Sequence, residues 1–203
     1  MKLLAFDLST PRGSIVLANE EEILCALDWP NDRRNTAPFF AALNEIIREH
    51  GAPETIVVGL GPGSYTGTRI AISTAIGLQA TTGAALTGIP SLCAVSDENE
   101  FCVMGDAKRA SFFFAKLNGG LLVSDPELLS ENEMNDRILS ITAIPIYSSD
   151  ELPQFTGVTL RFPSARLLCT RAQSYPENVT RAPLAPIYLR EPHITAPRTA
   201  QRR

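Results

Sequence analysis

The stretch TIVVGLGPGSYTGTRIAISTAIGLQATT, residues 55–82, decides the fold. Its first part, residues 55–60, is a continuous apolar run between Pro53 and Gly61, which predicts a strand covered on both faces of its sheet. The GPGSYTG loop follows, and residues 66–82 have the pattern of apolar positions that predicts a helix. A buried strand that leads through a glycine loop into a helix is typical of a sheet with helices packed on its faces.

The residues around this stretch extend the same pattern. Three short β-rich segments separated by turn residues predict an antiparallel meander: residues 3–7, 14–18 and 23–29. A helix is predicted at 36–50, with Asn35 or Thr36 as its cap, a further strand at 84–87 and a short helix from Ser91. This order of elements is that of the ribonuclease H-like and actin-like ATPase domains.

A second lobe is predicted from about residue 98. Four further elements are expected in it: strands at 101–104 and 111–117, and helices at 130–139 and 165–173. The tail from Arg181 carries four prolines and is expected to be extended. We therefore predict an α/β protein with two lobes of mixed sheets flanked by helices. The N-terminal lobe is 1–97, and the smaller second lobe with its arginine- and proline-rich tail is 98–203.

Charge is distributed unevenly over the 203 residues, whose net charge is −4. Residues 1–160 hold ten basic against twenty acidic side chains, and residues 161–203 hold eight arginines against two glutamates. An acidic body repels a phosphate backbone, which argues against tight, independent binding of nucleic acid. The tail arginines either pair with the carboxylates of the body, remain solvated, or make a few phosphate contacts.

The cysteines and the start of the chain indicate a cytoplasmic protein. Cys25, Cys93, Cys102 and Cys169 match neither a metal or redox pair nor a disulfide framework, so they are interpreted as buried or idle thiols. The apolar run after Met1 is too short for a signal peptide. Residues 70–96 carry no charge, but polar residues and Pro90 interrupt them, so no membrane segment is expected.

Two groups of residues could form an anion or nucleotide site. Asp7 ends the first strand beside Ser9 and Thr10, at the position that lies near phosphates and metal in actin-like ATPases. The second group is in the glycine loop before a helix, where backbone amides and the helix dipole favour an anion: Gly61, Gly63, Ser64 and Thr66. The alternatives are structural, with Asp7 capping its own turn and the loop serving as a tight connection.

No catalytic group, metal site or cofactor site is evident from the residue pattern. His50 and His193 are far apart, and no HExxH, HxxxH or GxSxG motif occurs. The helix at 66–82 instead has apolar residues on two sides, so it is either wholly internal or meets another subunit. Spacing alone leaves open whether Ile72 or Ala75 faces outward.

Five motifs together resemble the bacterial TsaB family, also called YeaZ. GPGSYTGTRIAIS, residues 61–73, is the most specific of them. The others follow in the family's order: FDLST at 6–10, IPSLCAVS at 89–96, GDAKRASFFFA at 105–115 and PLAPIYLR at 183–190. The resemblance implies the two-lobed fold of actin, sugar kinases and Hsp70, and a role in forming threonylcarbamoyladenosine beside the tRNA anticodon.

In that pathway TsaB is an accessory subunit without catalytic activity. It pairs with its metal-bearing paralogue TsaD, TsaE joins the pair and hydrolyses ATP, and tRNA is bound only through the complex. Family members associate through helices that correspond to residues 36–50 and 66–82, which also implies a weak homodimer. The expected contact residues are Phe39, Leu43, Ile47, Ile70, Ile72, Ala75 and Ile76.

One departure from the family and one alternative function remain. Arg34-Asn35-Thr36 replaces a segment in which relatives commonly carry a histidine. The alternative is a free-standing ATPase or small-molecule kinase of the same fold, which would use Asp7 and the GPGSYTG loop.

The end of the tail is expected to contribute little to tRNA binding. Removing residues 198–203 deletes Arg198, Arg202 and Arg203, yet tRNA binding by the complex should weaken only slightly. The salt dependence of the affinity, measured with and without these residues, checks this. A salt slope smaller by about three units would show that all three arginines contact phosphates.

Overall fold

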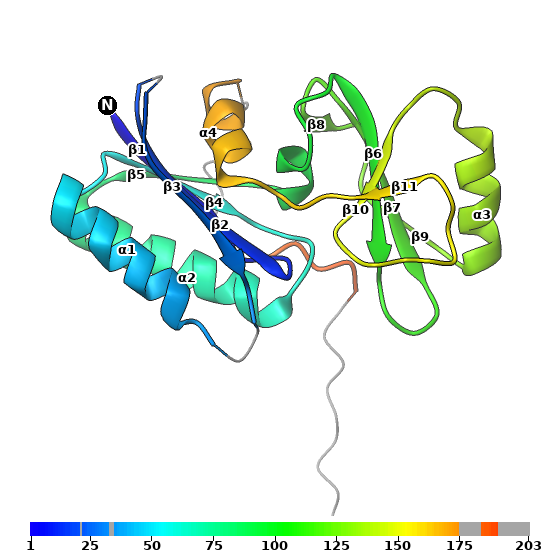
Figure 1. Cartoon of the computed structure of the whole chain (residues 1–203), viewed down its shortest axis with the longest axis horizontal. Helices are drawn as coiled ribbons and strands as arrows, with labels where there is room; N and C mark the ends of the chain where they lie inside the picture. The colour runs from blue at the N-terminus through cyan, green and yellow to red at the C-terminus, as the bar shows by residue number, and fades with distance from the viewer. Residues whose placement is uncertain (21, 33–34, 175–183, 191–203) are drawn as a thin grey trace, which may run out of the picture.

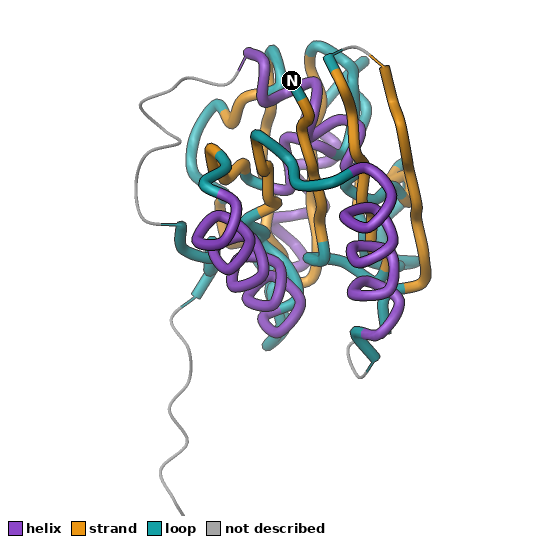
Figure 2. Tube along the Cα trace, turned by 90° about the vertical axis from the view of Figure 1, so that its left-hand side faces the viewer, coloured by secondary structure: helices purple, strands orange, loops and turns teal. Residues whose placement is uncertain are grey.

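The structure, a computed structural model, describes residues 1–20, 22–32, 35–174 and 184–190. Figure 1 shows two lobes side by side, each built on one sheet. The strands of the first sheet run along one another with helices packed against them, as Figure 2 also shows. The predicted α/β architecture of two mixed sheets flanked by helices is confirmed.

The first sheet contains five strands in the order β3-β2-β1-β4-β5. Its strands are β1 (Lys2–Asp7), β2 (Arg12–Asn19), β3 (Glu22–Pro30), β4 (Thr55–Gly59) and β5 (Ala85–Ile89). The first three are antiparallel, as the predicted meander requires, and β1, β4 and β5 are parallel. A hairpin-linked meander extended by parallel strands after helical crossovers is the topology of the ribonuclease H-like and actin-like fold.

Alternation along the strands gives this sheet two apolar faces. In β1, Leu4 and Phe6 pack into the core under one layer of helices, whereas Leu3 and Ala5 pack into the core on the opposite face. Successive side chains of a strand point to opposite faces, so a run without polar residues is expected of a strand covered on both sides.

Three helices cover these faces. Helices α1 (Ala37–His50) and α2 (Tyr65–Thr82) lie on one face, and α4 (Ala165–Ser174) lies on the other (Figure 1). Thr36, one of the two proposed caps, is the N-cap residue of α1, but its side chain makes no capping hydrogen bond; Asn35 Oδ1 instead accepts from the amide of Ala37 at 3.1 Å. Among the helices of the described residues, none has the length and apolar character needed to cross a membrane.

The second lobe is a sheet in the order β11-β10-β6-β7-β8, with β9 paired to β7. Its elements, after the short 3-10 helix η1 (Ser91–Ala94), are β6 (Glu100–Asp106), β7 (Phe112–Asn118), β8 (Leu121–Leu122), β9 (Glu127–Leu129), α3 (Glu131–Ser140), β10 (Ile146–Ser148) and β11 (Val158–Leu160). Helix α3, predicted at 130–139, begins with a reciprocal capping box between Ser130 and Glu133.

The chain returns to the first lobe after β11, which the division at residue 98 does not anticipate. The amide of Ala165 donates to Ser14 Oγ at 2.9 Å, and α4 packs on the first sheet. Ile187 N donates to Leu60 O at 2.8 Å. Residues 165–174 and 184–190 therefore pack with the first sheet. Helix α4 covers the sheet face opposite α1 and α2. Residues 175–183 and 191–203 lie outside the described residues.

Neither Ile72 nor Ala75 lies on the outer side of α2. Ile72 is 5% exposed and Ala75 is fully buried, so the expectation that one of them faces outward is wrong. Both contribute to the core between the helices and the first sheet.

Substituting either residue by glutamate is therefore expected to disrupt folding. Ile72→Glu and Ala75→Glu each bury an unpaired carboxylate, which costs about 3–5 kcal/mol of unfolding free energy. Denaturant unfolding followed by circular dichroism measures the loss. A variant as stable as the unsubstituted chain would contradict the burial of that position.

Candidate functional site

The Asp7 carboxylate is a fully buried group at the end of β1. Oδ1 accepts hydrogen bonds from the amide of Ser9 at 2.8 Å and from its hydroxyl at 2.7 Å. Oδ2 accepts from Ser91 Oγ at 2.5 Å. Burial raises the pKa of Asp7, against the hydrogen bonds from Ser91 and Ser9 that lower it. The carboxylate caps its own turn, as the structural alternative predicted, and also ties β1 to η1.

The GPGSYTG loop uses much of its hydrogen-bonding capacity within the chain. Gly61 N donates to Ser91 Oγ at 2.9 Å, and Ser64 N donates to Ser9 O at 2.6 Å. Ser64 Oγ caps α2 by accepting from Gly67 N at 3.2 Å. These three amides would be among those offered to a phosphate in an anion-binding loop. Here Gly61 N ties the loop to η1, Ser64 N ties it to the β1–β2 turn, and Gly67 N is used in the cap of α2.

The loop glycines allow this close approach. A Cβ on Gly63 would lie 2.1 Å from Ser9 O, and one on Gly67 would lie 2.1 Å from Leu8 O. Both positions therefore exclude any larger residue unless the backbone moves. The glycine spacing of the motif is explained by packing against residues 8–9.

A cavity of about 310 Å³ lies where the two lobes meet. Ser9, Thr10, Gly63 and Ser64, four of the seven predicted anion-site residues, line it. The other three, Asp7, Gly61 and Thr66, are not among the described residues of its wall. Further wall residues come from the first lobe, from the second lobe and from the end of the described chain, and include Tyr65, Lys108, Asp150, Tyr188 and Arg190. The structure thus brings part of the predicted site together.

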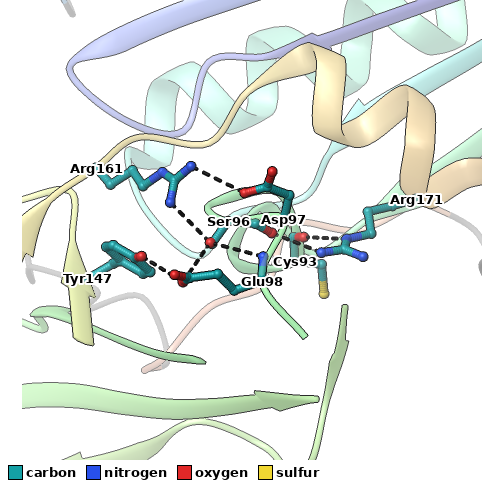
Figure 3. Close-up of polar contacts among 7 residues, drawn as sticks. All are labelled: Cys93, Ser96, Asp97, Glu98, Tyr147, Arg161 and Arg171. Atoms are coloured by element: carbon teal, nitrogen blue, oxygen red, sulfur yellow. Dashed lines mark hydrogen bonds and ion pairs between the residues drawn. The ribbon is translucent and has the colours of Figure 1, made fainter. Parts of the chain in front are cut away.

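A network of hydrogen bonds around the segment that connects the lobes joins residues of both lobes (Figure 3). Ser96 Oγ, on the connection between η1 and β6, accepts from Arg161 at 3.0 Å and donates to Glu98 at 3.0 Å. Glu98 also accepts from the Tyr147 hydroxyl at 2.6 Å. Arg171 of α4 donates to the Ser96 carbonyl at 2.8 Å. The crossing segment is therefore held by groups from both lobes.

Comparison with known proteins assigns the family. Residues 39–144, more than half of the chain, match the family model described as TsaD, tRNA N6-adenosine threonylcarbamoyltransferase. The chain belongs to the TsaD family. The match covers α1, the GPGSYTG loop, α2 and most of the second sheet.

Solved structures of YeaZ, another name for TsaB, have the same fold as this TsaD-family chain. YeaZ from Pseudomonas aeruginosa aligns with a TM-score of 0.69 at 19% identity, over 92% of this chain and all of that one. An uncharacterized protein with similarity to peptidase YeaZ from the same organism aligns with a TM-score of 0.71 at 21% identity, over 93% and 99%. The resemblance inferred from the motifs is confirmed for family and fold.

Curated relatives of this TsaD-family chain occur in mycobacteria. An uncharacterized Mycobacterium leprae protein is 25% identical over 90% of the chain, which spans only 44% of that protein's length. An uncharacterized Mycobacterium tuberculosis protein is 24% identical over 94% of the chain and 92% of its own length. The chain thus aligns with nearly the whole of the Mycobacterium tuberculosis protein and with less than half of the Mycobacterium leprae protein.

The contact residues expected on α1 and α2 are divided between core and surface. Four are buried beneath the helices: Phe39, Leu43, Ile72 and Ala75. Ile47 and Ile70 are half-buried, and Ile76 is 46% exposed. The structure adds Phe40, also 46% exposed, which is not in the expected set. Of the predicted set, Ile76 is thus the most open to a partner.

No group of three or more potential metal ligands occurs within the described ranges of this TsaD-family chain. Three cysteines, Cys93, Cys102 and Cys169, are buried, and Cys25 is half-buried. Burial raises the pKa of Cys169 to about 12. A thiol with such a pKa remains protonated at neutral pH and is a poor nucleophile.

We expect Asp7→Ala to lower the free energy of unfolding by about 2–4 kcal/mol, because Ser9 and Ser91 lose the acceptor of their buried donors. Since the folded pKa of Asp7 is raised, the carboxyl favours folding most when protonated. Its contribution is complete below the ordinary pKa and falls as pH rises through the raised one. Urea unfolding of both proteins at several pH values checks the size and the sign. A difference that grows with pH would contradict the assignment.

Proposed function

We propose that this chain is a non-catalytic pairing subunit of the tRNA threonylcarbamoyl transferase, whose catalytic site lies on a TsaD-like paralogue. In this assembly a TsaE-like ATPase joins the pair, and tRNA is bound only through the complex. The complex acts in the cytoplasm, and the isolated chain self-associates weakly through the same surface. Membership of the TsaD family and the YeaZ fold support this assignment.

One observation carries the proposal: α1 and α2 expose large apolar side chains on the side turned away from their sheet. Phe40 and Ile76 are each 46% exposed, although the inner sides of their helices are buried. Next to Ile76 on α2, the exposed Ser73 and Gly77 are small. Nothing lies within 4 Å of a Cβ built on Gly77. Exposed apolar groups beside small residues suit close packing of a second protein.

The site geometry supports a chain without a nucleotide site of its own. The Asp7 carboxylate accepts hydrogen bonds from Ser9 and Ser91, and Asp7 does not line the cavity. A phosphate-binding loop needs free amides, but those of Gly61 and Ser64 are used within the chain. The alternative of a free-standing ATPase or kinase receives no comparable support, since it depends on these groups.

Charged substitutions on the outer side of the helices test the proposal. Ile76→Glu and Phe40→Glu, made separately, should leave the chain folded, because both side chains already reach solvent. Each should weaken binding to the TsaD-like paralogue by about 2–4 kcal/mol, since an unpaired carboxylate would be buried in the contact. Sedimentation of the two purified subunits measures the affinity, and threonylcarbamoyladenosine formation measures the consequence.

A matched control is Leu139→Glu, because Leu139 is 81% exposed on α3, in the other lobe. It should leave both pairing and tRNA modification unchanged. If Ile76→Glu and Phe40→Glu pair as tightly as the control, the proposed contact face is incorrect.

A further inference from the structure

The inter-lobe cavity contains one arginine whose charge is not used by the described part of the chain. Arg190 lines the cavity and is only partly exposed. Its Nε is buried and has no hydrogen-bond partner among the residues described. A guanidinium keeps its charge at any pH that a protein tolerates, so it cannot escape this cost by losing a proton. The position calls for an acceptor.

The other charged groups of the wall have hydrogen-bond partners away from Arg190. Lys108 Nζ lies 2.5 Å from Asp106 Oδ2, and the amide of Lys108 donates to Asp106 Oδ1. Asp150 Oδ2 accepts from the amide of Asp106 at 2.9 Å. Among the described residues no ion pair joins Arg190 to Asp106 or Asp150, so its guanidinium is available to an anion that enters from solvent.

The rest of the cavity indicates the size and character of that anion. Apolar side chains form much of its wall: Leu92, Val103, Met104, Phe113 and Ile187. Two tyrosines also line it, Tyr65 and Tyr188, whose rings stack with centroids 5.4 Å apart. At about 310 Å³ the cavity is at the lower end of small-molecule sites. An oxyanion attached to a compact apolar or aromatic body matches these walls.

We propose that this cavity binds a small organic acid whose carboxylate is held by Arg190. A planar carboxylate accepts two parallel hydrogen bonds from a guanidinium, which satisfies the buried Nε. Ser64 also lines the cavity; its hydroxyl oxygen accepts from Gly67 N, and its proton, which donates to no described group, can serve as a second donor to the anion. The ligand's apolar body packs against the aliphatic and aromatic wall. This inference does not depend on the pairing role proposed above.

Titration of the full chain with benzoate tests the site. The side-chain Nε–H signals of nitrogen-15-labelled arginine should show one large shift at millimolar benzoate, absent with uncharged benzamide. Arg190→Lys removes one arginine and so assigns the shifted signal. Arg190→Gln, followed by calorimetry, should weaken benzoate binding at least tenfold, because the charge and the planar fork are both lost.

Arg48→Gln is the matched control, since Arg48 is an exposed helix arginine outside the cavity wall, paired with Glu49. It should bind benzoate like the unsubstituted chain. The proposal is overturned if benzoate leaves the Arg190 signal unmoved, if benzamide binds equally well, or if Arg190→Gln binds benzoate as tightly as the control. The Arg190 signal in the unsubstituted chain decides the matter even if Arg190→Gln does not fold.

Discussion

The bond between the Asp7 carboxylate and the Ser91 hydroxyl is the interaction on which the central part of this structure depends. Ser91 Oγ also accepts from Gly61 N, so β1, the GPGSYTG loop and η1 are joined at one buried point. Gly59 must lack a side chain there, because a Cβ would lie 1.8 Å from Asp7 Oδ2. A buried carboxylate is tolerated only when its oxygens are satisfied, and here Ser9 and Ser91 supply the donors.

This arrangement changes what an aspartate at the end of the first strand can do. A carboxylate that positions metal or phosphate must present its oxygens to a cleft. In this chain the Asp7 oxygens are buried and accept hydrogen bonds from Ser9 and Ser91, so the residue has a structural role. The network around Ser96 and Arg171 is also structural, since it fixes the segment that connects the two lobes. Two lobes held in one orientation suit a subunit that presents a preformed surface to a partner.

Strong local signals made several elements predictable. The apolar run at 55–60, the glycine loop and the helix after it appear where the sequence placed them, within one or two residues. The helix predicted at 130–139 also appears, as α3, shifted by one residue at each end. The return of α4 to the first sheet was not predictable, because the apolar pattern of residues 165–174 does not indicate which of the two sheets the helix packs on. The burial of both Ile72 and Ala75 escaped prediction, because α2 has apolar residues on two sides and spacing does not say which side meets the sheet.

The sequence by itself determined the order of elements, the antiparallel meander, the glycine loop and the family, because these depend on neighbours in the chain. Only the tertiary structure decided which residues of the candidate site lie in the cavity and which are used within the fold. Asp7 was a plausible ligand until Ser91, 84 positions away, was found to occupy its second oxygen. Arg190 ends the PLAPIYLR motif, but its spacing gave it no role until the structure showed that it lines the cavity, as Ser64 and Lys108 do. Such roles arise from contacts between distant segments, and local spacing carries no information about which segments meet.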